Sequence, residues 1–132
     1  ELAATVASAM PARSRNEAQH PARRTFQAVR IEVNGELDAL KQLLAAAVGR
    51  LADHGRLCII SFHSLEDRLV KDAFRSWENP CTCPREFPRC ICGAVPLGKI
   101  VTRRPVTAGT GEEEANPRSR SAKLRVFERT IS

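Results

Sequence analysis

Apolar residues recur at helical spacing in two stretches of the chain, on either side of one short apolar run. The first stretch follows Gly35 and ends near Gly55, with one apolar stripe: Leu37, Leu40, Leu44, Ala47, Val48 and Leu51. The second follows Ser64 and keeps the same period: Leu65, Leu69, Val70, Ala73, Phe74 and Trp77. A stripe of this kind predicts a helix that packs one face against a core.

Between these stretches lies "RLCIISF", residues 56–62, a continuous and Ile-rich apolar run. It predicts a strand buried on both faces, which is typical of parallel sheets covered by helices. Cys58 would then be a core residue. Helix, strand and helix over residues 36–77 form the repeating unit of a doubly wound α/β sheet.

The two ends of the chain are less regular. Residues 1–10 predict a small-residue helix stopped by Pro11, and residues 11–22 a polar linker. Residues 23–33 fit either a strand leading to an Asn34-Gly35 hairpin turn or a helical face. Near the C-terminus, "KIVTRRP" predicts a short strand, residues 103–122 a long charged loop, and "KLRVFERT" a last strand. The two strands would add an antiparallel edge to the parallel sheet.

The strand exit "FHSLEDR", residues 62–68, combines helix-start signals with candidate chemistry. Ser64 followed by Asp67 matches a capping pattern, so Ser64 is expected to cap the helix, with Glu66 and Asp67 at its positive end. Ligands of open α/β sheets lie beyond the carboxyl ends of the strands. His63, just before the expected cap, is therefore the candidate catalytic residue. Because Ser64 has no flanking glycines, a nucleophile elbow and a Ser-His hydrolase are disfavoured.

Residues 78–98 hold four cysteines and four prolines, which predicts an irregular insertion. Two Cys-x-Cys pairs, Cys81 with Cys83 and Cys90 with Cys92, could bind one tetrahedral zinc ion. Four thiolates leave no open position, so such an ion would be structural. Two alternatives remain: two disulfides, which need an oxidising compartment, or thiols of a surface loop without metal.

The net charge of +6, from 21 Lys and Arg against 15 Asp and Glu, suits a polyanionic partner such as nucleic acid. Arginine dominates, and its planar guanidinium makes bidentate contacts to phosphates and base edges. The candidate RNA-binding residues are His20, Arg23, Arg24, Gln27, Arg30, Arg68, Arg118 and Arg120. The alternatives are a solvated helix face around Arg24 and a flexible basic loop around Arg118.

Several classes of function lack their sequence signals. Apolar stretches stay well short of the ~20 residues of a membrane span. The first residues have no signal-peptide pattern, so we expect a cytoplasmic protein. The glycines are scattered, without a Walker motif or a dinucleotide fingerprint. A nucleotide-like cofactor would therefore bind outside these residues.

Three strings together resemble the C-terminal part of the bacterial small-subunit ribosomal RNA methyltransferase H family: "HPARRTFQAVRIEVNGEL", "GRLCIISFHSLEDRLVK" and "NPRSRSAKLR". The resemblance implies S-adenosylmethionine-dependent methylation of the exocyclic amine of a cytosine in 16S ribosomal RNA. It implies a class I (Rossmann-like) methyltransferase sheet with an inserted helical domain. Residues 1–22 would be the end of that insertion and a linker, and residues 23–132 the C-terminal part of the methyltransferase domain. It also favours a helix over residues 23–52, and makes the Cys-rich segment 78–98 an insertion carried by some members.

The family's cofactor-binding half, with its Gly-rich loop, is missing from these 132 residues. The resemblance therefore places the S-adenosylmethionine site mostly outside this chain, in a missing N-terminal half. The expected partners are that half and 16S ribosomal RNA or the small ribosomal subunit, without a membrane. Two other interpretations stay open: a stand-alone zinc-containing RNA-binding module, and an inactive truncation.

Overall fold

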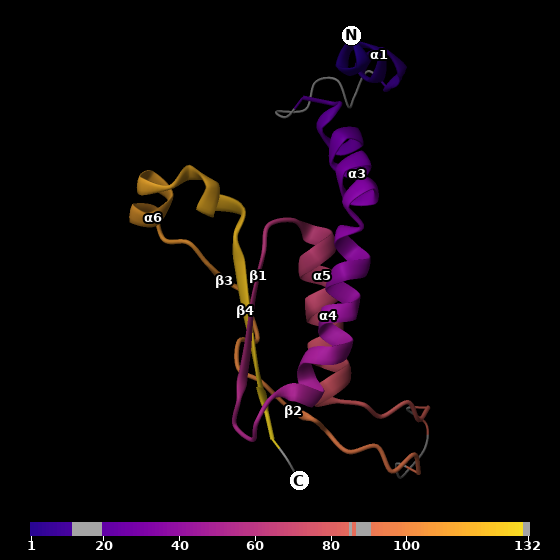
Figure 1. Ribbon diagram of the computed structural model, residues 1–132, viewed down its shortest axis with the longest axis vertical. Helices are drawn as coiled ribbons and strands as arrows, with labels where there is room; N and C mark the ends of the chain where they lie inside the picture. The colour runs from indigo at the N-terminus through magenta and orange to yellow at the C-terminus, as the bar shows by residue number, and fades with distance from the viewer. Residues whose placement is uncertain (12–19, 85, 87–90, 131–132) are drawn as a thin grey trace. The chain divides into compact units, whose positions relative to one another are not determined.

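In the computed structural model, the described residues are 1–11, 20–84, 86 and 91–130. The chain divides into two compact units, Glu1–Ala39 and Leu40–Ser132. The helices and strands, labelled in Figure 1, are α1 (Leu2–Ala9), α3 (Arg23–Asn34), α4 (Glu36–Arg50), β1 (Arg56–Ser61), α5 (Ser64–Glu78), β2 (Gly98–Ile100), β3 (Val106–Thr107), α6 (Thr110–Ala115), the 3-10 turn η1 (Pro117–Ser121) and β4 (Lys123–Arg129). Each described helix falls short of the length and apolarity that a bilayer crossing requires.

The first unit is helical. Helix α1 confirms the prediction for residues 1–10, whereas most of the predicted linker, residues 12–19, lies outside the described part. Helix α3 decides the ambiguous stretch in favour of a helix. Gly35 ends it in the left-handed region at φ 60°, and α4 begins at the next residue. The Asn-Gly pair is thus a helix C-cap, a position that favours glycine for the same reason as a hairpin turn does.

The second unit is built on a small antiparallel sheet. Its strand order is β1-β4-β2, and β3 also pairs with β4. The antiparallel addition predicted from the last strands is confirmed, but β4 lies between its neighbours and not at an edge. All strand pairings among the described residues involve β4, and each of them is antiparallel. The predicted parallel sheet is therefore not seen in the described part of the chain.

Helices α4 and α5 lie on the same side of this sheet (Figure 1), and the core lies between. Its fully covered members are Leu44, Val70, Phe74 and Phe127. Phe74, Trp77 and Phe127 form a ring cluster, with centroids 5.2–5.4 Å apart. Most of both predicted stripes is confirmed, although Leu65 remains 44% exposed. The stripe residues that form the core or pack against it are Leu40, Leu44, Val48, Leu69, Val70, Ala73, Phe74 and Trp77.

The opposite face of β1 corrects one prediction. Leu57 and Ile59 pack against the core, but Cys58 and Ile60 point the other way and are exposed, Ile60 by 57%. The strand is therefore not buried on both faces within the described chain, and Cys58 is not a core residue. The apolar run was read correctly as a strand, but a sequence pattern does not reveal whether a second layer covers the other face.

The segment after β2 corrects the prediction of a long charged loop. The charged loop predicted for residues 103–122 contains β3, α6 and η1. Local signals explain the turn η1: the Asn116 side chain accepts a hydrogen bond from the Arg118 N–H at 3.2 Å, and Pro117 occupies the first turn. The Ser119 hydroxyl, itself buried, donates to the Asn116 carbonyl at 2.8 Å. The basic string is thus held in a fixed turn.

Glu128 on β4 is a buried carboxylate that joins three strands. Arg56 on β1 contacts its Oε2 at 2.8 Å, and Lys99 on β2 contacts its Oε1 at 3.0 Å. Both residues face Glu128 in the strand register. The hydrogen bond from Arg56, followed by that from Lys99, lowers the pKa of Glu128 from 4.5 to about 2.

This shift predicts acid sensitivity. A carboxylate with a lowered pKa stabilises the fold fully above its unfolded pKa, and the contribution is lost as pH falls through the folded value. The free energy of unfolding should therefore fall between about pH 4.5 and about pH 2. Glu128→Gln should be less stable at neutral pH and should show a flatter pH profile, measured by urea unfolding of the full chain. The control is Glu114→Gln, an exposed acid on α6. An unchanged pH profile in Glu128→Gln would contradict the assignment.

Candidate functional site

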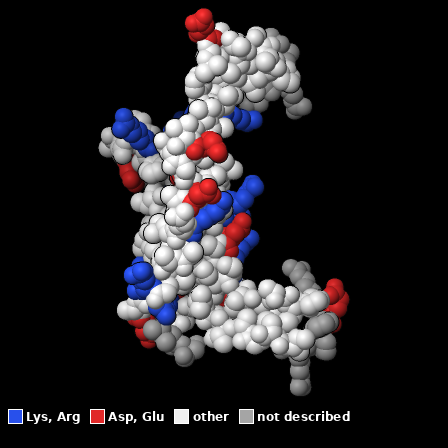
Figure 2. Space-filling model, turned by 45° about the vertical axis from the view of Figure 1, so that its right-hand side comes forward, with Lys and Arg blue, Asp and Glu red and all other residues white. Residues whose placement is uncertain are grey.

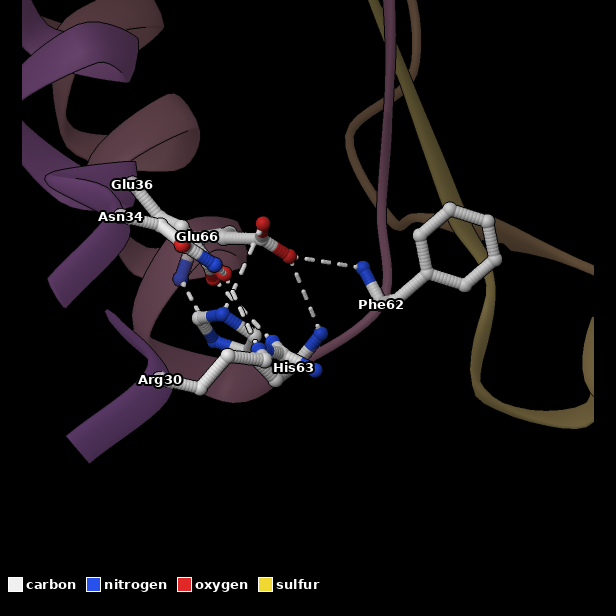
Figure 3. A network of polar contacts seen from close by, with 6 residues as sticks. All are labelled: Arg30, Asn34, Glu36, Phe62, His63 and Glu66. Atoms are coloured by element: carbon white, nitrogen blue, oxygen red, sulfur yellow. Dashed lines mark hydrogen bonds and ion pairs between the residues drawn. The ribbon is translucent and has the colours of Figure 1, made fainter. Parts of the chain in front are cut away.

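The connection from β1 to α5 is closed by a capping box. His63 occupies the N-cap, and its Nδ1 accepts a hydrogen bond from the Glu66 N–H at 3.3 Å. The Glu66 carboxylate in turn accepts from the N–H of Phe62 at 2.9 Å and of His63 at 3.3 Å (Figure 3). The orphan amides at the start of the helix are thereby satisfied reciprocally.

The prediction that Ser64 caps the helix is wrong, because the cap is the imidazole of His63. Ser64 is the first residue of α5 and is exposed. The capping box lies one residue earlier than expected, from His63 to Glu66. The pattern search missed it because histidine is seldom an N-cap, although a neutral imidazole nitrogen accepts a hydrogen bond as a hydroxyl oxygen does.

The cap limits what His63 can do chemically. A nitrogen that accepts a hydrogen bond carries no proton, so the proton of the neutral ring is on Nε2. Nε2 lies 3.5 Å from Glu66 Oε1, and the side chain is only 10% exposed. The lone pair of Nδ1 is used by the helix, so His63 could accept a substrate proton there only by giving up its cap.

Asp67 was expected to act only on the helix dipole, but it also forms an ion pair across the core layer. Arg125 on β4 donates from Nε to Oδ1 at 2.7 Å and from Nη2 to Oδ2 at 3.1 Å. Lys123 Nζ lies 3.9 Å from Oδ2. The hydrogen bonds from Arg125 hold the pKa of Asp67 below its usual value. The sequence did contain a signal, since a charge inside "KLRVFER" needs a partner wherever the strand is buried.

The strand register brings several predicted residues to one end of the sheet. Ser61, the last residue of β1, faces Lys123, the first residue of β4. The start of α5 and the turn η1 therefore both lie at this end, which we call the β1 exit. Exposed arginines flank it on both elements: Arg68, Arg118 and Arg120. Sequence reasoning placed His63 at a strand end. That η1 lies at the same end of the sheet follows from the register of β1 and β4, which depends on pairing between distant segments.

The other predicted RNA-binding residues lie on or next to α3 in the first unit. Helical spacing puts Arg23, Gln27 and Arg30 on one face. Arg23 and Arg24 are exposed. Arg30 Nε lies 2.9 Å from Glu36 Oε1, so its charge is partly compensated (Figure 3).

The remaining imidazole of the predicted set, His20, braces the chain just before α3. Its Nδ1 accepts from the Ala22 N–H at 3.2 Å.

On the face of the molecule in Figure 2, Lys and Arg side chains alternate with acidic and uncharged ones. The basic residues are therefore local clusters, each to be tested separately.

A groove beside α5 was not anticipated from the sequence. Its volume is about 430 Å³, and four of its lining residues are basic: Lys71, Arg75, Arg103 and Arg125. Two of them already pair with carboxylates, since Arg103 Nη1 lies 3.0 Å from Glu78 Oε2 and Arg125 contacts Asp67. The groove combines residues from α5, β2 and β4, which only the fold brings together.

The connection at the β1 exit does not fit a site for a nucleotide-like cofactor. Residues 62–64 contain no glycine, so the backbone cannot approach a ligand as a Gly-rich loop does. The Glu66 carboxylate also accepts from the N–H groups of Phe62 and His63, directly before the helix, and its negative charge there disfavours a phosphate or carboxylate of a ligand. We therefore assign no cofactor contact to the connection between β1 and α5.

Of the four predicted metal ligands, three come together. The sulfur atoms of Cys81, Cys83 and Cys92 all lie within 4.8 Å of one another. Cys90 lies outside the described residues. The irregular structure predicted for residues 78–98 is confirmed for the described part of this segment, because helices and strands are absent there between the end of α5 and the start of β2. That it is an insertion stays a prediction.

Comparison with known proteins agrees with the resemblance seen in the sequence. The sequence model of the MraW methylase family matches residues 1–130. Proteins named "Ribosomal RNA small subunit methyltransferase H" are similar: that of Lachnospira eligens is 53% identical over 98% of this chain, that of Symbiobacterium thermophilum 55% over 95%, and that of Geobacter sp. strain M21 54% over 98%. The chain spans 41%, 39% and 41% of these relatives. A match over nearly its whole length places the chain in the MraW methylase family, as a part of a Rossmann-like α/β methyltransferase.

Proposed function

We propose that the chain is the C-terminal part of an enzyme that methylates the exocyclic amine of a cytosine in 16S ribosomal RNA, with S-adenosylmethionine as methyl donor. The observation that carries the proposal is the identity of more than half the residues, over at least 95% of the chain, with proteins named as small-subunit ribosomal RNA methyltransferases. Residues 1–22 would then end an inserted helical domain. The enzyme would act on the small subunit or its RNA, in the cytoplasm.

The uncovered face of the sheet supports a larger enzyme over a stand-alone RNA-binding module. Ile60 on β1 is 57% exposed, Phe62 just after the strand is 56% exposed, and Val106 on β3 is 52% exposed. Adjacent apolar side chains on a sheet face are normally covered by a further layer. The longer relatives have the additional chain to supply it, and the donor site belongs there, because the β1 exit has no glycine loop.

The chemistry assigns limited tasks to this chain. A cytosine amine is a poor nucleophile, since its lone pair is delocalised into the ring. The donor supplies an electrophilic methyl group, and the protein must place the amine in line and allow its proton to leave. The base must also leave its stack to enter a pocket. In this proposal the β1 exit forms part of the pocket wall, and the exposed arginines hold the RNA backbone.

The arginines of η1 give the first test. Arg118→Gln with Arg120→Gln, placed in the complete enzyme, should weaken RNA binding and lower the salt slope by about 0.7 for each single-strand phosphate that is no longer neutralised. S-adenosylmethionine binding should not change. Arg50→Gln is the matched control, an exposed arginine at the far end of α4. An RNA affinity and salt slope equal to those of the control would make the η1 arginines solvated surface residues.

The arginines of α3 are tested in the same titration. Arg24→Ala should weaken RNA binding without affecting donor binding. Arg30→Ala should do the same, and should also loosen the α3–α4 junction, because it removes the partner of Glu36. Circular dichroism separates the two effects. Unchanged RNA affinity in Arg24→Ala would remove α3 from the proposed RNA surface.

His63 is tested by separating its cap from its imidazole. His63→Ala should lower the free energy of unfolding by about 1 kcal/mol, and His63→Asn should recover most of it, because asparagine is a good N-cap. Ser64→Ala should have little effect, since Ser64 is not the cap. Both His63 variants should slow single-turnover methylation by the complete enzyme if the imidazole also contacts the substrate. Full activity of a stable His63→Asn enzyme would show that His63 caps the helix and has no role in methylation.

The proposed location of the donor site outside this chain can be tested with the chain alone. The purified chain should not bind S-adenosylmethionine, because the β1 exit has no glycine loop and its helix start is occupied by Glu66. Isothermal titration calorimetry with the chain and with the complete enzyme measures this. Saturable binding by the chain alone would contradict the proposed location of the donor site.

A further inference from the structure

Three thiols converge in the segment between α5 and β2. The sulfur atoms of Cys81, Cys83 and Cys92 lie within 4.8 Å of one another. Thiolates bound to one tetrahedral zinc at about 2.3 Å lie about 3.8 Å apart, a separation that this cluster accommodates. A disulfide requires about 2.05 Å, and the cysteines described here form none. The geometry therefore fits ligands gathered around a common ion.

The segment that carries these thiols has little else to hold it. Its described part forms neither helix nor strand, and its apolar side chains are exposed, Ile91 by 76% and Val95 by 58%. Ordering each residue costs roughly 1–2 kcal/mol of backbone entropy, which apolar burial usually offsets. Among the described residues of this segment that burial is small, so a bound ion would supply order that packing there does not. Gly93, at φ 61°, turns the chain immediately after Cys92 in a conformation that favours glycine.

The two ends of the segment are fixed to the core. The Leu97 N–H donates to the Trp77 carbonyl at 2.8 Å, and the Ile100 N–H donates to Glu78 Oε1 at 2.9 Å. At Gly98 an added Cβ would lie 2.8 Å from Phe127 Cζ, so the chain enters β2 in close contact with the core. A constraint within the segment would therefore also fix the approach to β2.

We propose that Cys81, Cys83 and Cys92 bind one zinc ion, which holds this segment together. The three thiolates leave the fourth position of a tetrahedral ion to a further ligand. Each thiol releases its proton on binding, and zinc accepts the sulfur ligands without redox change. Soft thiolates favour zinc over Mg²⁺ or Ca²⁺, which prefer oxygen ligands. Cys90, predicted from the sequence as the fourth ligand, lies outside the described residues, so the proposal stands on the other three. It does not depend on the proposed methylation.

Metal analysis of the full chain tests this directly. The chain is purified without oxygen, supplied with zinc and dialysed before elemental analysis. We expect about one zinc per chain, falling at least tenfold in a Cys83→Ser/Cys92→Ser variant. Cys58→Ser is the matched control, because Cys58 is an exposed thiol on β1 outside the cluster, and it should keep its zinc. Zinc content near zero in the unmodified chain, or equal content in both variants, would overturn the proposal.

A second measurement guards against loss of folding in the variant. Zinc added to the metal-free, reduced chain should slow proteolytic cleavage within residues 79–97 severalfold, while core stability changes little. The chain with Cys58→Ser should respond equally, and the chain with Cys83→Ser/Cys92→Ser should not respond. If the rate of cleavage in the unmodified chain is the same with and without zinc, no ion holds the segment together.

Discussion

The paired charges buried along β4 are the constraint on which the second unit depends. Arg125, Val126, Phe127 and Glu128 are consecutive buried residues, and two of them are charged. A buried charge is tolerated only with a partner, and removal of one partner is strongly destabilising. Arg125 finds its partner on α5, in Asp67, and Glu128 finds its partners on β1 and β2. A register shift of one residue would leave both charges unpaired and move Phe127 out of the core.

This constraint also fixes the candidate site. Asp67 lies in the first turn of α5, so its pairing with Arg125 fixes the start of that helix beside β4. The capping box of His63 and Glu66 then closes the connection from β1. The end of the sheet that carries the exposed η1 arginines is therefore built from paired and capped groups. Such a rim can present side chains to a ligand at defined positions, because little of its backbone is left unsatisfied.

Two segments of the chain are stabilised by different means. The sheet and its two helices have an aromatic and aliphatic core, with Phe74, Trp77 and Phe127 in mutual contact. The segment between α5 and β2 has no such core among its described residues, and its thiols provide the means for a metal staple. The other face of β1 differs from both segments, because its apolar residues are exposed. The longer relatives have additional chain that can cover such a face. The described sheet is thus well packed on one face and open on the other.

The sequence by itself determined the elements whose signals are local. The 3.6-residue stripes of α4 and α5, the apolar run of β1 and the alternation in β4 each predicted the right element, and three contiguous strings pointed to the family. For the four cysteines it left three interpretations open: one zinc ion, two disulfides, or thiols without metal. It could not choose between helix and strand for α3 from pattern alone. Val29, Ile31 and Val33 alternate as in a strand, whereas Phe26, Val29 and Val33 recur at helical spacing.

Only the tertiary structure decided the features that join distant segments. Ser64 seemed the cap until the geometry gave that role to His63, and Asp67 seemed to serve the helix dipole until Arg125 was found opposite it. Cys58 seemed buried because its neighbours are apolar, yet the described layers cover one face of β1. The physical reason is the same in each case. Propensity and periodicity are properties of neighbouring residues, whereas pairing of charges and covering of faces depend on which residues the folded chain brings into contact.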